Sequence, residues 1–171
     1  MIVGMALRKV FENLTLTVNN QNIAVQFHFG DQKEYNEWIA SKMRSNKQKY
    51  PLIWYVISEH ERQRNETINI DSQLILFMGT KQEYNNIQRY QHNYLTYLEP
   101  LLKLVNKTLE RHPYIQLYEN PINDFDEPNF GVDNASEFRG SQKKEPKSIG
   151  IDIVDAKILK IKMNINVNCI L

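Results

Sequence analysis

The sequence has few of the residues that build recognisable chemical sites. It contains one cysteine, Cys169, so an intramolecular disulfide is excluded, and no second thiol is present for a zinc site. We expect Cys169 to be a partly buried thiol near the end of the chain. The six glycines are scattered, and none of them forms a dinucleotide-binding or phosphate-binding loop.

Long apolar runs and charge of one sign are also missing. The formal net charge is +1 over 171 residues, which argues against a dedicated nucleic-acid binder but still allows a protein that lines a passage for DNA. No apolar stretch approaches the roughly 20 residues that span a bilayer. The short apolar run 1–7 is followed by Arg8 and Lys9, which is the wrong order for a signal peptide. We therefore expect assembly in the cytoplasm and no membrane partner.

Catalytic patterns are equally scarce. The acidic run 124–127 has carboxylates at calcium-like spacing but lacks the glycine and the distal glutamate of a calcium loop. Ser141 and Ser148 lack a glycine elbow. The histidines have no second metal ligand at helical spacing; they are His28, His60, His92 and His112. The sequence predicts no enzyme, no cofactor, no metal, and no catalytic or cofactor-binding residues.

The first half of the chain shows two helical and three extended patterns. Apolar residues at three-to-four-residue spacing predict an amphipathic helix over 3–14 and another over 35–43. Alternation predicts a half-buried strand over 23–29. The continuous apolar run 52–57 predicts a central strand covered on both faces. A second long strand over 68–77 is expected to pair with it in antiparallel orientation.

The second half contains the strongest helical pattern, over 94–109. Pro100 lies within this pattern, so the helix either begins near Glu99 or is kinked at the proline. A short strand is expected over 114–118 and a clean alternating strand over 159–167. Residues 81–93 show no clear period.

Together these patterns predict an α+β protein. We expect one domain over 1–171, with a mostly antiparallel sheet and two or three helices packed on one face. The apolar side chains of the two central strands should be buried under the helix that carries Leu98, Leu101 and Val105. These side chains are Leu52, Trp54, Val56, Leu74 and Leu76.

Tyrosines are concentrated in the middle of the chain. They are Tyr84, Tyr90, Tyr94, Tyr97, Tyr114 and Tyr118. Interleaved with Arg89 and Lys103 they could stack nucleic-acid bases, but such residues more often lie in protein interfaces. Both interpretations stay open, with the interface favoured.

Residues 119–148 form a long segment without helical or strand periodicity. Segments of this length in compact domains are usually functional or disordered, so we interpret it as a docking loop that contacts neighbouring subunits. The residues expected to make those contacts are Asp124, Phe125, Phe130, Phe138, Lys143 and Lys144.

The last strand has a polar side that includes Lys157, Lys160 and Lys162. One interpretation is a solvent-facing edge strand whose lysines prevent aggregation. The other is a strand lining a lumen, with these three lysines nearest to DNA.

Three segments resemble small tail-terminator and neck proteins of tailed bacteriophages, of the kind found in phages of Bacteroides-type hosts, including the crAss-like group. The first is Lys49-Tyr50-Pro51-Leu52-Ile53-Trp54, followed by an aliphatic strand. The second joins Arg89-Tyr90 to Tyr97-Leu98-Glu99-Pro100-Leu101-Leu102, which opens a helix. The third is the closing segment 151–162 with a terminal cysteine.

The resemblance covers residues 49–169 and matches the first 48 less well. Phe130-Gly131 stands where a tryptophan or tyrosine before the glycine is more usual. The resemblance implies a tail-terminator-like fold and a virion structural protein that forms a ring of six or twelve copies at the head-to-tail junction. The implied partners are other copies, the portal or neighbouring neck and tail proteins, and non-specific DNA in the lumen. A tail-completion or baseplate-adjacent virion protein and a small nucleic-acid-binding phage protein are the alternatives.

Overall fold

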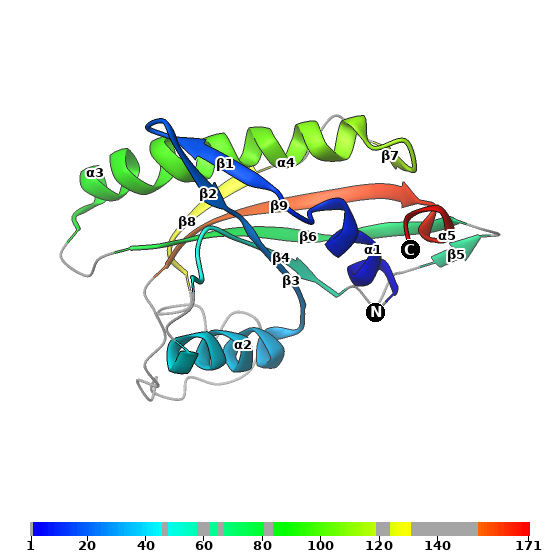
Figure 1. Cartoon of the computed structure of the whole chain (residues 1–171), viewed down its shortest axis with the longest axis horizontal. Helices are drawn as coiled ribbons and strands as arrows, with labels where there is room; N and C mark the ends of the chain where they lie inside the picture. Colours follow the sequence, from blue (N-terminus) through cyan, green and yellow to red (C-terminus); the bar gives the residue numbers. More distant parts are fainter. Residues whose placement is uncertain are drawn as a thin grey trace.

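The computed structural model describes residues 2–45, 48–57, 62–64, 67–80, 84–118, 124–130 and 154–171. A seven-stranded sheet forms its centre, in the order β3-β4-β6-β9-β7, with β5 paired to β6 and β8 paired to β9 (Figure 1). Its strands are β3 (Gln26–Gly30), β4 (Leu52–Val56), β5 (Arg62–Arg64), β6 (Thr67–Gly79), β7 (Ile115–Leu117), β8 (Asp124–Phe130) and β9 (Val154–Ile165). Among the strands of the described ranges, only β3 and β4 pair in parallel. The predicted α+β class with a mostly antiparallel sheet is confirmed.

The two longest strands, β6 and β9, pair along their whole length, from Ile68 opposite Ile165 to Gly79 opposite Val154. On its other side β9 pairs with β7 and β8. The interpretation of the last strand as an edge is therefore wrong: β9 is an interior strand. This explains why seven of its apolar positions are buried, since an interior strand has neighbours on both sides.

The helices cover both faces of the sheet. Helix α2 (Gln32–Ser45) lies on one face, where Tyr35 and Ile39 pack with Trp54 and Phe77. Helices α1 (Ile2–Val10) and α4 (Glu99–Arg111) lie on the opposite face (Figure 1). They pack against the strand residues that alternate with those facing α2. We expected the helices on one face of the sheet; this expectation is wrong for α2, which lies on the other face.

The predicted core is divided in the same way. Leu74 and Leu76 pack under Leu98, Leu101 and Val105, as expected. Leu52, Trp54 and the half-buried Val56 instead face α2. Neighbouring residues of a strand point to opposite faces, so the apolar run that predicted cover on both faces also required two separate helical layers.

Near the N-terminus, α1 is shorter than the predicted helix, and a hairpin of β1 (Thr15–Val18) and β2 (Gln21–Ala24) follows it. Asn19 and Asn20 form its two-residue loop with φ angles of 50° and 62°, the positive values that a type I′ turn requires. The predicted strand over 23–29 is thus divided between β2 and β3. Within α1, an added Cβ at Gly4 would lie 2.5 Å from the Phe29 ring, so glycine permits this close packing.

A continuous helical rod crosses the same face as α1. It consists of α3 (Asn86–Arg89), the π-helix η1 (Tyr90–Leu98) and α4. Asn85 and Gln88 form a capping box at its start. Pro100 lies at the junction of η1 and α4, where its missing N–H removes one backbone hydrogen bond from the continuous rod. Within the aperiodic stretch 81–93, residues 90–93 lie in the π-helix η1, whose turn is wider than that of an α-helix. The rod ends at Arg111, with His112 as its C-cap.

Part of the predicted docking loop forms β8, which pairs with β9 of the same chain from Asp124 opposite Leu159 to Phe130 opposite Val154. The expectation of a long loop without strand structure is therefore wrong for 124–130, whose backbone pairs with β9. The side chains of Asp124, Phe125 and Phe130 lie outside the described part of the structure. The other expected docking residues, Phe138, Lys143 and Lys144, lie outside the described residues altogether.

The chain closes with α5 (Val167–Ile170), a short helix that contacts α1. It carries Cys169, whose side chain is exposed rather than partly buried. Within the described ranges, no helix is long and apolar enough to cross a membrane.

Candidate functional site

Two charged residues of β9, Asp155 and Lys157, are buried in the layer between the sheet and the helical rod. Their exposed fractions are 0% and 2%. Asp155 lies opposite Met78 and Lys157 opposite Leu76 in the pairing with β6, which places both on the face that carries η1 and α4. A charge that leaves water is costly unless it is paired, so their partners define this site.

Asp155 binds the start of the helical rod. The side-chain amide of Asn93 donates a hydrogen bond of 2.6 Å to Oδ2, and Nη1 of Arg89 lies 3.5 Å from Oδ1. Nε of Arg89 also donates to the carbonyl oxygen of Tyr84, at 3.2 Å. Arg89 and Asn93 are themselves buried. The capping box that begins α3 thus sets the position from which both side chains reach the sheet.

Lys157 joins three segments that are distant in sequence. Its Nζ lies 2.7 Å from Oδ1 of Asp126 on β8 and 2.9 Å from Oε1 of Glu99 at the start of α4. The side chains of Asp126 and Glu99 are 46% and 37% exposed, whereas that of Lys157 is 3% exposed. The ammonium therefore ties the edge strand and the rod to the sheet from inside the protein.

Tyr94 lies between these two groups of charges, and its hydroxyl donates to the carbonyl oxygen of Ala156 at 3.4 Å. Burial, followed by the negative charges of Asp155 and Asp126, raises the pKa of Tyr94 above its ordinary value. Lys157 and Arg89 oppose this rise with smaller effects. The surroundings of the hydroxyl are thus negative on balance.

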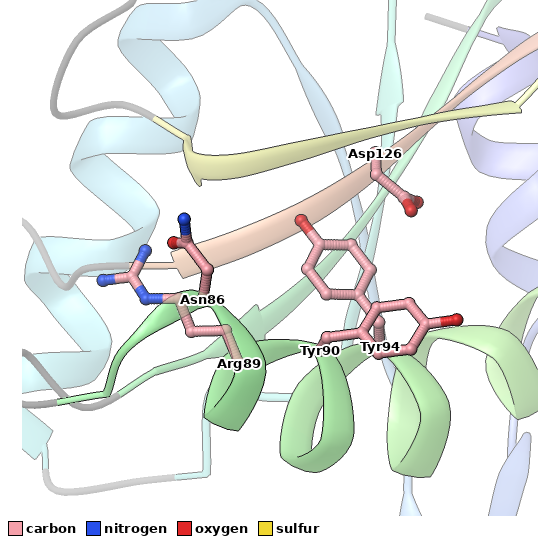
Figure 2. A pocket seen from close by; sticks show the side chains of 5 residues that line it. All are labelled: Asn86, Arg89, Tyr90, Tyr94 and Asp126. Atoms are coloured by element: carbon pink, nitrogen blue, oxygen red, sulfur yellow. The ribbon is translucent and has the colours of Figure 1, made fainter.

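A small cavity of about 140 Å³ opens beside Tyr94. It is lined by Asn86, Arg89, Tyr90, Tyr94 and Asp126. Figure 2 shows the side chains of Arg89 and Asp126 at opposite ends of this cavity, with Tyr94 between them. The cavity thus combines aromatic walls with a carboxylate at one end.

The side chains that line the cavity are suited to binding a ligand. A carboxylate, an amide and two tyrosine rings can hold a polar or cationic group. In the part of the chain that the structure describes, no group of three or more His, Cys, Asp or Glu side chains is placed to hold a metal ion.

The three lysines predicted to face DNA do not share a surface. Lys157 is buried and ion-paired, so its assignment to a DNA-facing surface is wrong. Lys160 and Lys162 are exposed and lie on the opposite face of β9, since strand residues of different parity point to different faces. The contact with DNA stays a prediction for the face that contains Lys160 and Lys162. The buried Lys157 does not belong to this face.

The tyrosines also divide into two groups. Tyr94 is buried, whereas Tyr90, Tyr114 and Tyr118 expose about half of their surface. The hydroxyl of Tyr118 donates to Oδ1 of Asn69 at 2.7 Å. Exposed aromatic side chains of this kind are common in protein interfaces.

Sequence reasoning did not identify Arg89, Asn93 and Asp155 as one site. A signal was present at Asp155, which interrupts the apolar run Ile153-Val154-Asp155-Ala156, because a charged residue inside a buried strand needs a partner. Arg89 and Asn93 carried no comparable signal, since they lie in the aperiodic stretch.

Comparisons with known proteins add no relative: no family model, no curated protein and no solved structure matches this chain.

Proposed function

We propose that this protein is a non-enzymatic virion structural protein that closes into a ring at the head-to-tail junction of a tailed bacteriophage, as a connector or tail-terminator subunit. The phage assignment rests on the sequence resemblance of residues 49–169. The ring rests on a structural observation, which is the placement of exposed apolar side chains at two ends of the molecule.

One apolar surface, which we name the α3 surface, follows the beginning of the helical rod. It consists of Ile87, Tyr90 and Leu95, which are 70%, 53% and 49% exposed. Large apolar side chains gathered on one element often mark an interface.

A second set of exposed apolar side chains, which we name the terminal surface, lies on α1, at the chain end after α5 and on the residues that flank β7. It consists of Ile2, Met5, Tyr114, Tyr118 and Leu171, each exposed by 43–52%. Figure 1 shows α3 at one end of the long axis, and α1, α5 and β7 towards the other.

Two different surfaces at opposite ends favour head-to-tail association. When one surface of a subunit binds the other surface of the next, the contact is heterologous, and it closes into a ring if the rotation divides a full turn. A single self-complementary patch would instead favour a two-fold dimer. The proposed ring contains six or twelve copies.

Light scattering coupled to size exclusion tests this directly. We expect a mass of six or twelve chains of 20.3 kDa and rings in electron micrographs. A monomer at all concentrations would contradict the proposal.

Variants at the two ends distinguish a ring from a dimer. Ile87→Ser with Leu95→Ser should inactivate the α3 surface, and Ile2→Ser with Met5→Ser should inactivate the terminal surface. Each variant alone should be monomeric, while an equal mixture should form only dimers, because one intact surface of each kind remains. Lys103→Ser on the exposed side of α4 is the control and should leave the ring intact. Dimers formed by either variant alone would overturn the head-to-tail arrangement.

The DNA-facing role is proposed for Lys160 and Lys162. Neutralising them should weaken sequence-independent DNA binding and reduce its salt dependence, because each phosphate contact releases counterions. Lys160→Gln with Lys162→Gln should show a shallower dependence of binding on salt than the wild type, whereas Lys103→Gln on α4, on the other face of the sheet, should not. An unchanged salt dependence would remove DNA contact from this face.

A further inference from the structure

We propose that the sheet face around Tyr118 binds single-stranded DNA, with an unpaired base stacked on the Tyr118 ring and phosphates at Lys160 and Lys162. This deepens the DNA contact proposed above for the two lysines and rests on that part of the proposed function. It does not depend on the ring. The observation that carries it is a tyrosine ring held against an open part of the sheet.

Helix α2 covers one half of its face of the sheet. It packs with β6 at Ile75 and Phe77 and with β9 at Ala156 and Ile158. Both strands continue past α2 towards β5 and β7 (Figure 1), and there the residues on the same face are polar. We name this part of the face the open half, because each of its residues is exposed or half-buried. They are Asn69, Asp71 and Gln73 on β6, and Lys160, Lys162 and Asn164 on β9.

The ring of Tyr118 lies across the open half. The backbone N–H of Tyr118 donates to the carbonyl oxygen of Lys162, so Tyr118 continues the pairing of β7 with β9. Its hydroxyl donates at 2.7 Å to Oδ1 of Asn69 on β6, the strand on the other side of β9. Two interstrand spacings, roughly 9.6 Å, separate β7 from β6, so the ring must lean over β9 to reach Asn69. One ring face therefore points to the sheet and the other to solvent, in agreement with an exposed fraction of 52%.

A ring in this position is a platform for stacking. The hydrogen bond to Asn69 fixes the side chain before a ligand arrives, so little rotamer freedom is lost on binding. Proteins that bind single strands stack bases on such aromatic faces with little preference among the bases. Both faces of a base inside a duplex are already covered by its neighbours. The platform therefore suits an unpaired base.

Two lysines lie beside the platform. Lys162 is opposite Tyr118 in the pairing of β7 with β9, and Lys160 follows on the same face, about 7 Å further along the strand. Both side chains are exposed. Both also make contacts within the protein, and Asp71 lies opposite Lys162 on β6. An ammonium has three donors, so a phosphate oxygen adds to these contacts without replacing them.

The combination of ring and lysines favours a nucleic acid over a neutral sugar. A sugar can stack on a tyrosine but has no charge for the lysines, whereas DNA offers both bases and phosphates. Asp71 reduces the attraction, so we expect weak binding that depends strongly on salt. Tyr118 is also a member of the terminal surface, yet its ring lies on the face of the sheet opposite to α1. A strand bound to this ring thus does not cover Ile2 and Met5.

Fluorescence anisotropy with three short DNA ligands tests the inference on the full chain. An octamer of deoxythymidine carries bases and phosphates, an abasic octamer carries the phosphates alone, and a duplex of eight G·C pairs has no unpaired base. Ligands of this length keep avidity between neighbouring subunits small. We expect the thymidine octamer to bind about fivefold or more tightly than the abasic octamer, which is the effect of stacking one base.

Variants of the ring separate stacking from charge. Tyr118→Leu keeps an apolar side chain without the ring, so it should abolish the preference for the thymidine octamer and leave the affinity for the duplex within about twofold. Tyr118→Phe keeps the ring and loses only the bond to Asn69, so it should retain most of the preference. Tyr90→Leu removes a ring of similar exposure, 53%, from the rod on the other face and should retain all of it.

A measurement on the unsubstituted chain is independent of how Tyr118→Leu folds. The protein is labelled with fluorotyrosine, and the fluorine resonance of Tyr118 is assigned with Tyr118→Phe. This resonance should shift on addition of the thymidine octamer and should stay in place with the abasic octamer, because only a stacked base changes the surroundings of the ring.

Equal affinities for the thymidine and abasic octamers, or a preference that survives Tyr118→Leu, would overturn the inference. A neutral oligosaccharide that shifts the Tyr118 resonance when the thymidine octamer does not would assign the platform to a sugar and also overturn it. If the abasic octamer and the duplex still bind through Lys160 and Lys162, the DNA contact of the proposed function stands and stacking alone is refuted. A thymidine preference in a protein that forms no ring would refute the ring and support the present inference.

Discussion

The side-chain amide of Asn93 donates a hydrogen bond of 2.6 Å to Oδ2 of Asp155, a residue with no exposed surface. Leaving a buried acceptor without this donor costs about 1–3 kcal/mol. Asn93→Leu has a similar volume and should lower the free energy of unfolding in urea by this amount. Gln91→Leu, an exposed position on the same π-helix, should change it by less than about 0.5 kcal/mol. Equal free energies for the two variants would show that Asn93 does not stabilise the buried charge.

Lys157→Met should loosen the edge strand β8. The methionine keeps the apolar stem but removes the ammonium that holds Asp126 and Glu99. Because both carboxylates are partly exposed and can regain water, we expect a loss of about 1–3 kcal/mol rather than the larger cost of a fully buried pair. Hydrogen exchange of the backbone amides of 124–130 should become faster than in Lys160→Met, whose lysine is exposed. Unchanged exchange in β8 would mean that backbone pairing alone holds the strand.

Leu76→Ala should cost roughly 2–5 kcal/mol in the free energy of unfolding, the usual range for a fully buried leucine. Its side chain has no exposed surface and packs in the cluster that contains Leu98 and Leu101. Leu95→Ala removes an equal volume from a residue that is 49% exposed and should cost far less. Denaturant unfolding of both variants measures the difference. A loss below half of the expected range for Leu76→Ala would place β6 at the margin of the core.

Tyr94 should make the protein sensitive to alkali. The pKa of its hydroxyl is raised in the folded state, so the unfolded state loses the proton first as the pH rises. This contribution to stability is fully present below the unfolded pKa of about 10 and decreases as the pH rises from there towards the folded pKa. Tyr94→Phe should therefore lose less stability than the wild type between neutral pH and pH values above about 10. Parallel pH profiles for the two proteins, measured by urea unfolding, would contradict this assignment.

The spacing of apolar residues along the sequence was sufficient to predict most of the sheet. The runs around Trp54 and Leu76 and the alternation after Leu159 gave the three central strands, and Pro100 gave the start of α4. These signals are local, because a strand or helix shows its buried face in its own sequence. The β1–β2 hairpin was missed even though Asn19-Asn20 is a good turn sequence, since its short strands follow a helical pattern without a break.

The candidate site could not be predicted in the same way, because its residues come from segments that are far apart in the sequence. Lys157 has the parity of Leu159 and therefore points to the helical layer. There Glu99 and Asp126, from distant segments, neutralise it. Lys160, by contrast, lies on the other face. Parity along the strand already separates these two lysines. What the sequence does not hold is the pairing that brings Asp126 of β8 and Glu99 of α4 to Lys157, because it is a property of the assembled protein.

The π-helix η1 fixes the angular phase between the two halves of the rod. Within it the N–H of Glu99 bonds to the carbonyl of Tyr94, five residues earlier, whereas an α-helix would use the fourth. Each α-helical residue advances the chain by about 100°, so deleting one residue such as Thr96 would turn α3 relative to α4 by roughly that angle. Arg89 and Asn93 would then swing away from Asp155, and Ile87 would leave the outer surface. The winding of η1 over Tyr90–Leu98 thus determines which side chains of the rod face the interior and which face a neighbour.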